Sequence, residues 1–214
     1  MSTIPREKIA LVVFVACILL IIAGIVAYLF AGHSWNYAAS RIDDATGEMD
    51  GYRVVMYEGT AVPKSSRINA KGELKKTPVS LAAAKRSYGE KGADVFTVDT
   101  KNLSLYRTPL IIERDGYRIG IMSVETADTR RDMQNHADYL AKRQCDMVMA
   151  IAPNASTVSG ITGIDVVLDL EQTGPLSASS VNAHRYRVKM SDVGTVGAIV
   201  ISPSEVVSAR TVTR

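Results

Sequence analysis

One apolar segment near the N-terminus restricts this chain more than any other feature. It runs from Ile9 to Ala31, 23 residues without a charged side chain. In a helix that rises about 1.5 Å per residue, this length crosses the roughly 30 Å hydrocarbon core of a bilayer. A cleavable signal peptide has a shorter apolar core, about 7–15 residues, followed by a small-residue cleavage site. The segment therefore predicts a single-pass, uncleaved signal anchor.

The flanks of this segment predict its orientation in the membrane. Arg6 and Lys8 precede it, whereas Asp43 and Asp44 follow it. Basic residues beside a span stay on the cytoplasmic side. The expected organisation is a cytoplasmic N-terminus (1–8), a transmembrane anchor (9–31), a polar stalk (32–50) and one extracytoplasmic domain (51–214).

Charge and cysteine content limit what the external part can be. It contains 23 basic and 21 acidic residues. This near-balance argues against a nucleic-acid partner, because such surfaces need a clear excess of positive charge. Cys145 is the only cysteine beyond the anchor, so no disulfide can form within this domain. We expect Cys145 to be a small buried residue.

The apolar pattern beyond residue 50 predicts an α/β sandwich with mixed sheets, preceded by the single transmembrane helix. Met147–Ile151 and Ile164–Leu170 are continuous apolar runs, typical of strands buried on both faces. Asp115 and Gly116 between two apolar segments predict a two-residue hairpin turn. Further strands are expected at residues 52–57, 94–98, 110–113, 117–124, 185–190, 197–201 and 206–212, and helices at 79–90 (Leu81, Ala82 and Tyr88 on one face) and 131–143 (Met133, Ala137 and Leu140 inward).

Several segments match, in order, the motifs of one enzyme superfamily. Residues 92–98 (GADVFTV) are similar to the strand before its G-N-H motif, and residues 115–121 (DGYRIGI) to its hairpin strand. Residues 124–126 (VET) are similar to the T-P-E-T that often follows, and residues 145–174 to its two histidine-bearing strands. Together these segments resemble the metallophosphoesterase superfamily, and most closely its bacterial 5′-nucleotidase and capsule-synthesis branches. The resemblance implies a metallophosphoesterase-like fold from about Tyr52 to Thr213.

The family's metal-binding side chains are replaced in this chain. Two-metal catalysis needs a bridging carboxylate and further ligands that donate lone pairs. Proline has no ligating side chain, lysine adds a cation where a metal would bind, and the G-D motif with the bridging aspartate has no counterpart. The matching positions are Glu58 and Thr60 for D-x-H, Asp99, Thr100 and Lys101 for G-N-H, Pro153 for the next histidine, and Glu171 and Thr173 for G-H-x-H.

These positions predict a ligand-binding surface at the strand ends, with no catalytic residue and no two-metal centre. Glu58 and Glu171, expected on adjacent strand ends, offer oxygen ligands for at most one weakly bound Mg²⁺ or Ca²⁺. Lys101 with Arg107 offers a place for a phosphate or another small anion. In both cases solvated surface residues are the simpler interpretation.

Three functions follow from the sequence. The first is a membrane-anchored, extracytoplasmic pseudoenzyme that binds or organises an envelope protein or a small anionic ligand at the bacterial cell surface. The second is an active phosphoesterase or 5′-nucleotidase with an atypical metal site built on Glu58, Asp99 and Glu171. The third is a structural subunit of an envelope complex, held mainly through its anchor. Only the second requires the three carboxylates to converge.

Overall fold

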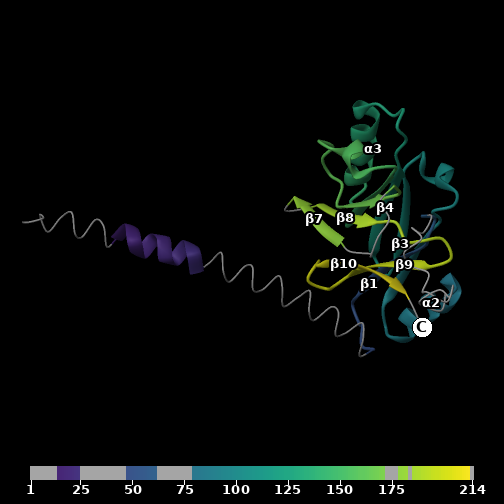
Figure 1. Ribbon diagram of the computed structural model, residues 1–214, viewed down its shortest axis with the longest axis horizontal. Coiled ribbons are helices and arrows are strands. Elements are labelled where there is room, and N and C mark those ends of the chain that lie inside the picture. The colour runs from purple at the N-terminus through teal and green to yellow at the C-terminus, as the bar shows by residue number, and fades with distance from the viewer. Residues whose placement is uncertain (1–13, 25–46, 62–78, 172–177, 183–184, 213–214) are drawn as a thin grey trace, which may run out of the picture.

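The computed structural model describes residues 14–24, 47–61, 79–171, 178–182 and 185–212 (Figure 1). Residues 14–24 are helical. Within the described ranges, no helix is long and apolar enough to cross a membrane. The rest of the expected anchor, residues 9–13 and 25–31, and most of the stalk lie outside the described residues.

The described strands form a smaller and a larger mixed sheet. The four-stranded sheet has the order β10 (Val207–Val212), β9 (Val196–Ile201), β1 (Arg53–Glu58) and β2 (Asp94–Val98). Strand β1 pairs parallel with β2 and antiparallel with β9, which pairs antiparallel with β10. Strand β1 therefore lies between β2 and β9, and β9 comes from the C-terminal part of the chain.

The six-stranded sheet has a parallel centre and antiparallel margins. Its order is β3 (Leu110–Arg114), β4 (Tyr117–Ser123), β5 (Met147–Ala152), β6 (Val166–Asp169), β8 (Arg185–Lys189) and β7 (Ala178–Asn182). Strands β4, β5, β6 and β8 are parallel, whereas β3 and β7 pair antiparallel with their neighbours. A parallel centre needs apolar residues on both faces, and β5 and β6 are buried throughout.

The two sheets pack face to face, with a helix outside each. Alternate residues of both sheets fill the core between them, among them Tyr57, Phe96 and Leu168. Helix α2 (Leu81–Glu90) covers the outer face of the four-stranded sheet through Ala84 and Tyr88. Helix α3 (Arg130–Lys142) covers the larger sheet through Met133, Ala137 and Leu140. Figure 1 shows α2 and α3 on opposite sides of the sandwich.

Both helices begin at hydroxyl caps that the sequence provides. The Ser80 hydroxyl accepts a hydrogen bond from the Ala83 N–H at 3.2 Å, and the Thr129 hydroxyl accepts one from the Asp132 N–H at 3.2 Å. Each bond satisfies a first-turn donor that has no partner within the helix. These caps fix where the apolar faces of the two helices meet the sheets.

The parallel strands of the two sheets run in the same direction. The Tyr57 hydroxyl near the end of β1 donates to the carbonyl of Lys189 at the end of β8, 3.3 Å away. At the other edge, the Arg53 guanidinium at the start of β1 lies 4.2 Å from the ring centre of Tyr117 at the start of β4. The carboxyl ends of β1, β2, β4, β5, β6 and β8 therefore share one edge of the sandwich, called the strand-end edge below; the other is the strand-start edge.

Most expected elements are present, and the exceptions have physical reasons. The hairpin turn is confirmed, because Asp115 and Gly116 have φ of 49° and 80°, the positive values that a type I′ turn needs. Helix α2 buries Ala84 with Tyr88, whereas Ala82, expected inward, is exposed. Cys145 is only partly buried, at the margin of the α3 cluster. Strand β7 was not expected, since its sequence ASSVN has no apolar alternation.

Candidate functional site

Glu58 and Lys101 form an ion pair at the strand-end edge. Glu58 is the last residue of β1, and Lys101 lies three residues beyond β2, its parallel neighbour. The Lys101 ammonium contacts Oε2 of Glu58. This hydrogen bond, with the charge of Glu58, raises the pKa of Lys101 above its usual value. The ammonium therefore stays protonated beside the carboxylate.

Thr100 and Asp99 hold the segment that carries Lys101. The buried Thr100 hydroxyl donates to the backbone carbonyl of Glu58 at 2.5 Å. Oδ1 of Asp99 accepts hydrogen bonds from the N–H groups of Lys101 (2.9 Å) and Asn102 (3.1 Å). The Asp99 carboxylate thus caps a turn, and the turn keeps the lysine next to β1. Four positions matched to the family's first two metal motifs come together here.

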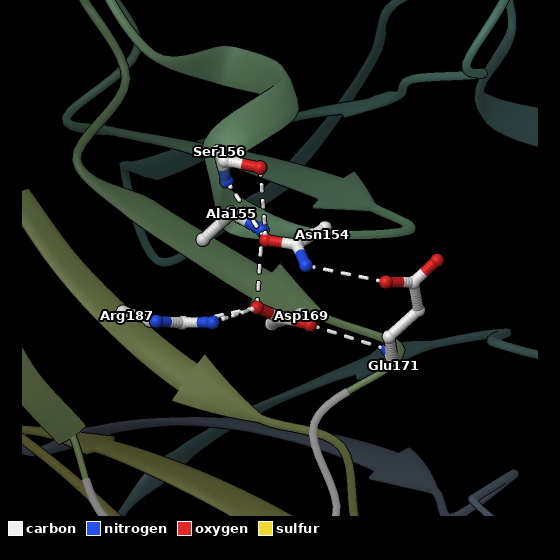
Figure 2. A network of polar contacts seen from close by, with 6 residues as sticks. All are labelled: Asn154, Ala155, Ser156, Asp169, Glu171 and Arg187. Carbon is white, nitrogen blue, oxygen red and sulfur yellow. Dashed lines mark hydrogen bonds and ion pairs between the residues drawn. The ribbon is translucent and has the colours of Figure 1, made fainter.

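A second cluster, centred on Asp169, lies at the ends of β5 and β6 (Figure 2). Asp169 is fully buried at the end of β6. Its Oδ2 accepts hydrogen bonds from Nε (3.0 Å) and Nη2 (2.6 Å) of Arg187 on β8 and from the Ala155 N–H (3.0 Å). Its Oδ1 accepts one from the Glu171 N–H at 3.2 Å. A buried carboxylate needs such partners, because an unpaired charge in the core is strongly unfavourable.

Asn154 and Glu171 form the outer part of the Asp169 cluster. Nδ2 of Asn154 donates to Oε2 of Glu171 at 3.2 Å. Oδ1 of Asn154 accepts from the N–H (3.0 Å) and the hydroxyl (3.1 Å) of Ser156, at the start of the short helix η3 (Ala155–Val158). Figure 2 shows the Asn154 side chain between that turn and Glu171. The amide joins the segment after β5 to the segment after β6.

Ser123 contributes a buried hydroxyl to the same edge. It ends β4 and is 6% exposed, and its Oγ has no hydrogen-bond partner among the described residues. A serine nucleophile needs a base within about 3.2 Å, and no described histidine is a hydrogen-bond partner of Ser123. Within the described ranges this hydroxyl therefore has no catalytic partner.

Lys101 and Arg107, considered from the sequence as a place for a small anion or as surface residues, each lie beside a carboxylate of the chain. Nε and Nη2 of Arg107 donate to the two carboxylate oxygens of Glu125, at 2.8 and 2.7 Å. Arg107 thereby lowers the pKa of Glu125, through these hydrogen bonds and through its charge. Because Lys101 is paired with Glu58 and Arg107 with Glu125, the two cations do not form a common anion site.

Glu58 and Glu171 are not on adjacent strand ends, which corrects an expectation from the sequence. Glu58 belongs to the four-stranded sheet, where its strand neighbours β2 and β9, whereas Glu171 follows β6 in the six-stranded sheet. Thr60 is partly buried just after β1. Thr173 lies outside the described residues.

The described side chains at the strand-end edge do not converge as a two-metal centre requires. Across the part of the chain that the structure describes, no group of three or more His, Cys, Asp or Glu side chains is placed to hold a metal ion. Glu58, Asp99 and Glu171 therefore do not form the convergent set that an atypical metal site requires. Each has a partner in the protein: an ammonium, two backbone N–H groups and an amide, respectively.

Asp169, Arg187 and Asn154 are site residues that the sequence reasoning missed. One signal was available for Asp169: an acidic residue at the end of the apolar run VVLD predicts a buried carboxylate that needs a cationic partner. Arg187 lies in the alternating segment RYRVK, which indicates a strand but not the partner of its guanidinium. Only the parallel pairing of β6 with β8 brings the two together.

Comparison with known proteins gives a distant likeness in fold. No protein-family model and no curated protein sequence matches the chain. Among solved structures, the NAD nucleotidase NadN of Haemophilus influenzae is 12% identical with a TM-score of 0.39; the match covers 65% of this chain and 29% of the nucleotidase. A hypothetical protein from Thermus thermophilus is 12% identical with a TM-score of 0.36, covering 76% and 99% of the two chains.

A third solved structure, the zinc complex of Vps29 from Entamoeba histolytica, is 11% identical with a TM-score of 0.27, covering 76% of this chain and 98% of Vps29. In its described residues the chain is a mixed α/β protein with two mixed sheets and few helices. Similarities this low do not assign a family or an activity.

Proposed function

We propose that this chain is a membrane-anchored, extracytoplasmic metallophosphoesterase-like domain without phosphoesterase activity, which binds or organises a protein at the cell envelope. The observation that carries the proposal is the ion pair of Lys101 with Glu58 at the strand-end edge. In the family that the sequence resembles, the first strand ends in metal ligands. Here the carboxylate at that position has an ammonium group of the same chain as its cation.

The chemistry of Lys101 explains why this pair opposes two-metal catalysis. An ammonium is a compact, strongly hydrated cation with three donors and no acceptor. It neutralises Glu58 without lowering the pKa of a water molecule or polarising a phosphoryl oxygen, as a metal would. A divalent ion at Glu58 has to displace this tethered cation first.

The surface at this edge favours a protein partner over a small anion. The side chains of Lys101 and Glu58 are 67% and 40% exposed, and those of Arg107 and Glu125 are 64% and 50% exposed. Each cation has a carboxylate beside it, which opposes the capture of a free anion. Mixed, exposed charges of this kind suit the polar rim of a protein interface, where they set register and specificity.

The active-enzyme alternative requires Glu58, Asp99 and Glu171 to move together around a metal. That movement would break the Lys101 ion pair, the Asp99 turn and the Asn154–Glu171 hydrogen bond. The structural-subunit alternative predicts a different effect of substitutions. In that case alanine substitutions within residues 18–27 abolish function, whereas changes at the strand-end edge have no effect.

Metal content and hydrolysis test the proposal directly. The full chain, purified in a non-ionic detergent, is assayed with Mn²⁺, Zn²⁺ or Ni²⁺ on bis(p-nitrophenyl) phosphate and on 5′-AMP. We expect no metal-dependent turnover and no stoichiometric transition metal. Turnover that is lost in a Glu58→Ala, Glu171→Ala double variant, but kept in a Glu90→Ala control on the exposed end of α2, would establish the active enzyme instead.

A further inference from the structure

A small cavity opens at the strand-start edge, on the side of the sandwich away from the candidate site. Its volume is about 180 Å³. The floor is made by Met147, Val166, Ile201 and Val207, all of them buried members of the core between the two sheets. Since a water molecule takes about 30 Å³ of liquid, the space corresponds to roughly six waters. It is large enough for a small organic molecule with an apolar part.

Two tyrosines form walls of this cavity. Tyr117 begins β4, and Tyr186 lies near the start of β8; both are partly buried. Aromatic faces carry negative charge density and attract cations. Tyr117 already shows this property, because the Arg53 guanidinium lies over its ring at 4.2 Å.

Three carboxylates complete the lining: Asp146, Asp165 and Glu205. Oδ2 of Asp146 accepts from the Arg118 N–H, and Oδ2 of Asp165 accepts from the Val148 N–H, both at 2.7 Å. These bonds fix the two carboxylates, which directly precede β5 and β6, to the backbone of the neighbouring strands β4 and β5. Burial raises the pKa of Tyr117, and the charges of all three carboxylates raise it further, against the opposing effect of Arg53. The three carboxylates therefore act on this wall of the cavity together with the positive charge of Arg53, whose effect on the pKa of Tyr117 exceeds that of any one of them.

Glu205 differs from the two aspartates in its backbone conformation. It lies in the turn between β9 and β10 with φ of 62°, and its N–H donates to the Ser202 carbonyl at 2.9 Å. Glycine or asparagine adopts this left-handed conformation at less cost than glutamate. The turn geometry thus does not explain why residue 205 is a glutamate. The position of Glu205 on the cavity wall does, because it places a carboxylate in the lining.

We propose that this cavity binds a small organic cation, a primary ammonium group on a short apolar stem. The stem fits the floor between the sheets, and the ammonium fits the carboxylates and the tyrosine faces. The three carboxylates oppose an anion. A bare metal ion fits poorly, since the only side-chain ligand atom of the floor is the soft thioether sulfur of Met147 and the carboxylates, like the other acidic side chains that the structure describes, form no group placed to hold one. This binding is independent of the strand-end edge.

The probe for this proposal is n-butylammonium chloride, added to the full chain in a non-ionic detergent. With ¹³C-methyl-labelled methionine, Met147 reports from the cavity floor, whereas Met133, on the buried face of α3, reports from elsewhere. We expect a saturable shift of the Met147 methyl signal at millimolar butylammonium and no shift of Met133. Butan-1-ol, which has the same stem without charge, should bind at least threefold more weakly.

Two substitutions of Glu205 remove the carboxylate in different ways. Glu205→Gln keeps the side-chain size, and Glu205→Gly suits the positive φ, so at least one variant keeps the fold. We expect both to weaken butylammonium binding at least threefold, while the matched control Glu90→Gln on α2 leaves it unchanged. The proposal is overturned if Met147 does not respond, if butanol binds as well as butylammonium, or if a folded Glu205 variant binds like the control.

Discussion

Two of the ion pairs at the strand-end edge, Asp169–Arg187 and Lys101–Glu58, differ in burial and in the segments that they join. Asp169 is fully buried, and the side chain of its partner Arg187 is 26% exposed. Lys101 and Glu58 are 67% and 40% exposed. The buried pair also joins backbone segments, because Asp169 accepts N–H groups from Ala155 and Glu171. The exposed pair joins only two side chains.

This difference in burial indicates which ion pair stabilises the fold and which is accessible to a partner. Exposed ion pairs add little stability, because water and salt screen them and two long side chains lose freedom. Buried pairs are costly to break from one side, since the remaining charge is left without a partner. We therefore expect the Asp169 cluster to hold the ends of β5, β6 and β8, and the Lys101 pair to be available to a partner.

The largest expected effect is that of Asp169→Ala. The change leaves the Arg187 guanidinium and two backbone N–H groups without their carboxylate, and we expect a loss of about 3 kcal/mol in the free energy of unfolding. Urea unfolding of the full chain, followed by circular dichroism, measures it. The double variant Asp169→Leu, Arg187→Met should recover part of the loss, because apolar residues of similar size often replace a buried pair well. If Asp169→Ala is as stable as the wild type, the buried ion pair contributes no more to stability than the exposed pair.

An intermediate effect is expected for Tyr57→Phe, at the residue that joins the two sheets at this edge. Loss of the hydrogen bond to the Lys189 carbonyl should cost about 1 kcal/mol near neutral pH. Burial raises the pKa of Tyr57 well above its usual value of 10.0. The neutral hydroxyl is thus favoured in the folded state, and its contribution is complete below pH 10. It is lost as the pH rises further, because the unfolded chain ionises first.

The wild type should therefore lose stability more steeply than Tyr57→Phe above pH 10, by up to about 1.4 kcal/mol per pH unit. Unfolding curves of both proteins between pH 8 and 11 test this difference. Parallel curves over that range would show that the Tyr57 hydroxyl does not stay buried and neutral. The other tyrosines are common to both proteins and cancel in the comparison.

The smallest effect on stability is expected for Lys101→Ala. Its ammonium is exposed, so the melting temperature should stay within error of the wild type. The variant leaves Glu58 and the nearby Asp99 without the cation, and we expect weak, millimolar Ca²⁺ binding that the wild type lacks. Isothermal titration measures this binding, with Lys85→Ala on the exposed face of α2 as the matched control. Equal Ca²⁺ binding by both variants would show that Lys101 does not act as the cation of this edge.

Much of the fold follows from local sequence patterns. Two continuous apolar runs predict β5 and β6, and the Asp115-Gly116 pair predicts the β3–β4 hairpin, because both signals act over a few residues. The polar strand β7 lacks such a signal, since it pairs along its backbone with β8. On α2 the inward placement of Tyr88 is confirmed, whereas Ala84 is buried in place of Ala82, because a short helix with three consecutive alanines shows little contrast between its faces.

The candidate site was predictable only where neighbouring strands carry it. Glu58, Thr100 and Lys101 come from the parallel neighbours β1 and β2, so matching their positions to one motif set already places them together. Glu171 belongs to the other sheet, and nothing local in the sequence gives its distance from Glu58. Arg187 reaches Asp169 across a strand pair separated by a long connection, which a pattern read along the chain does not reveal.

The enclosed position of β1 has a consequence for how the chain folds during synthesis. This strand leaves the ribosome early, yet one of its two neighbours, β9, is translated near the end of the chain. The larger sheet, by contrast, is complete once β8 has emerged. Contacts between distant segments form slowly because the intervening chain must be ordered first. We expect the six-stranded sheet to form first. Until β9 and β10 have been synthesised, β1 has an unpaired edge to which chaperones can bind.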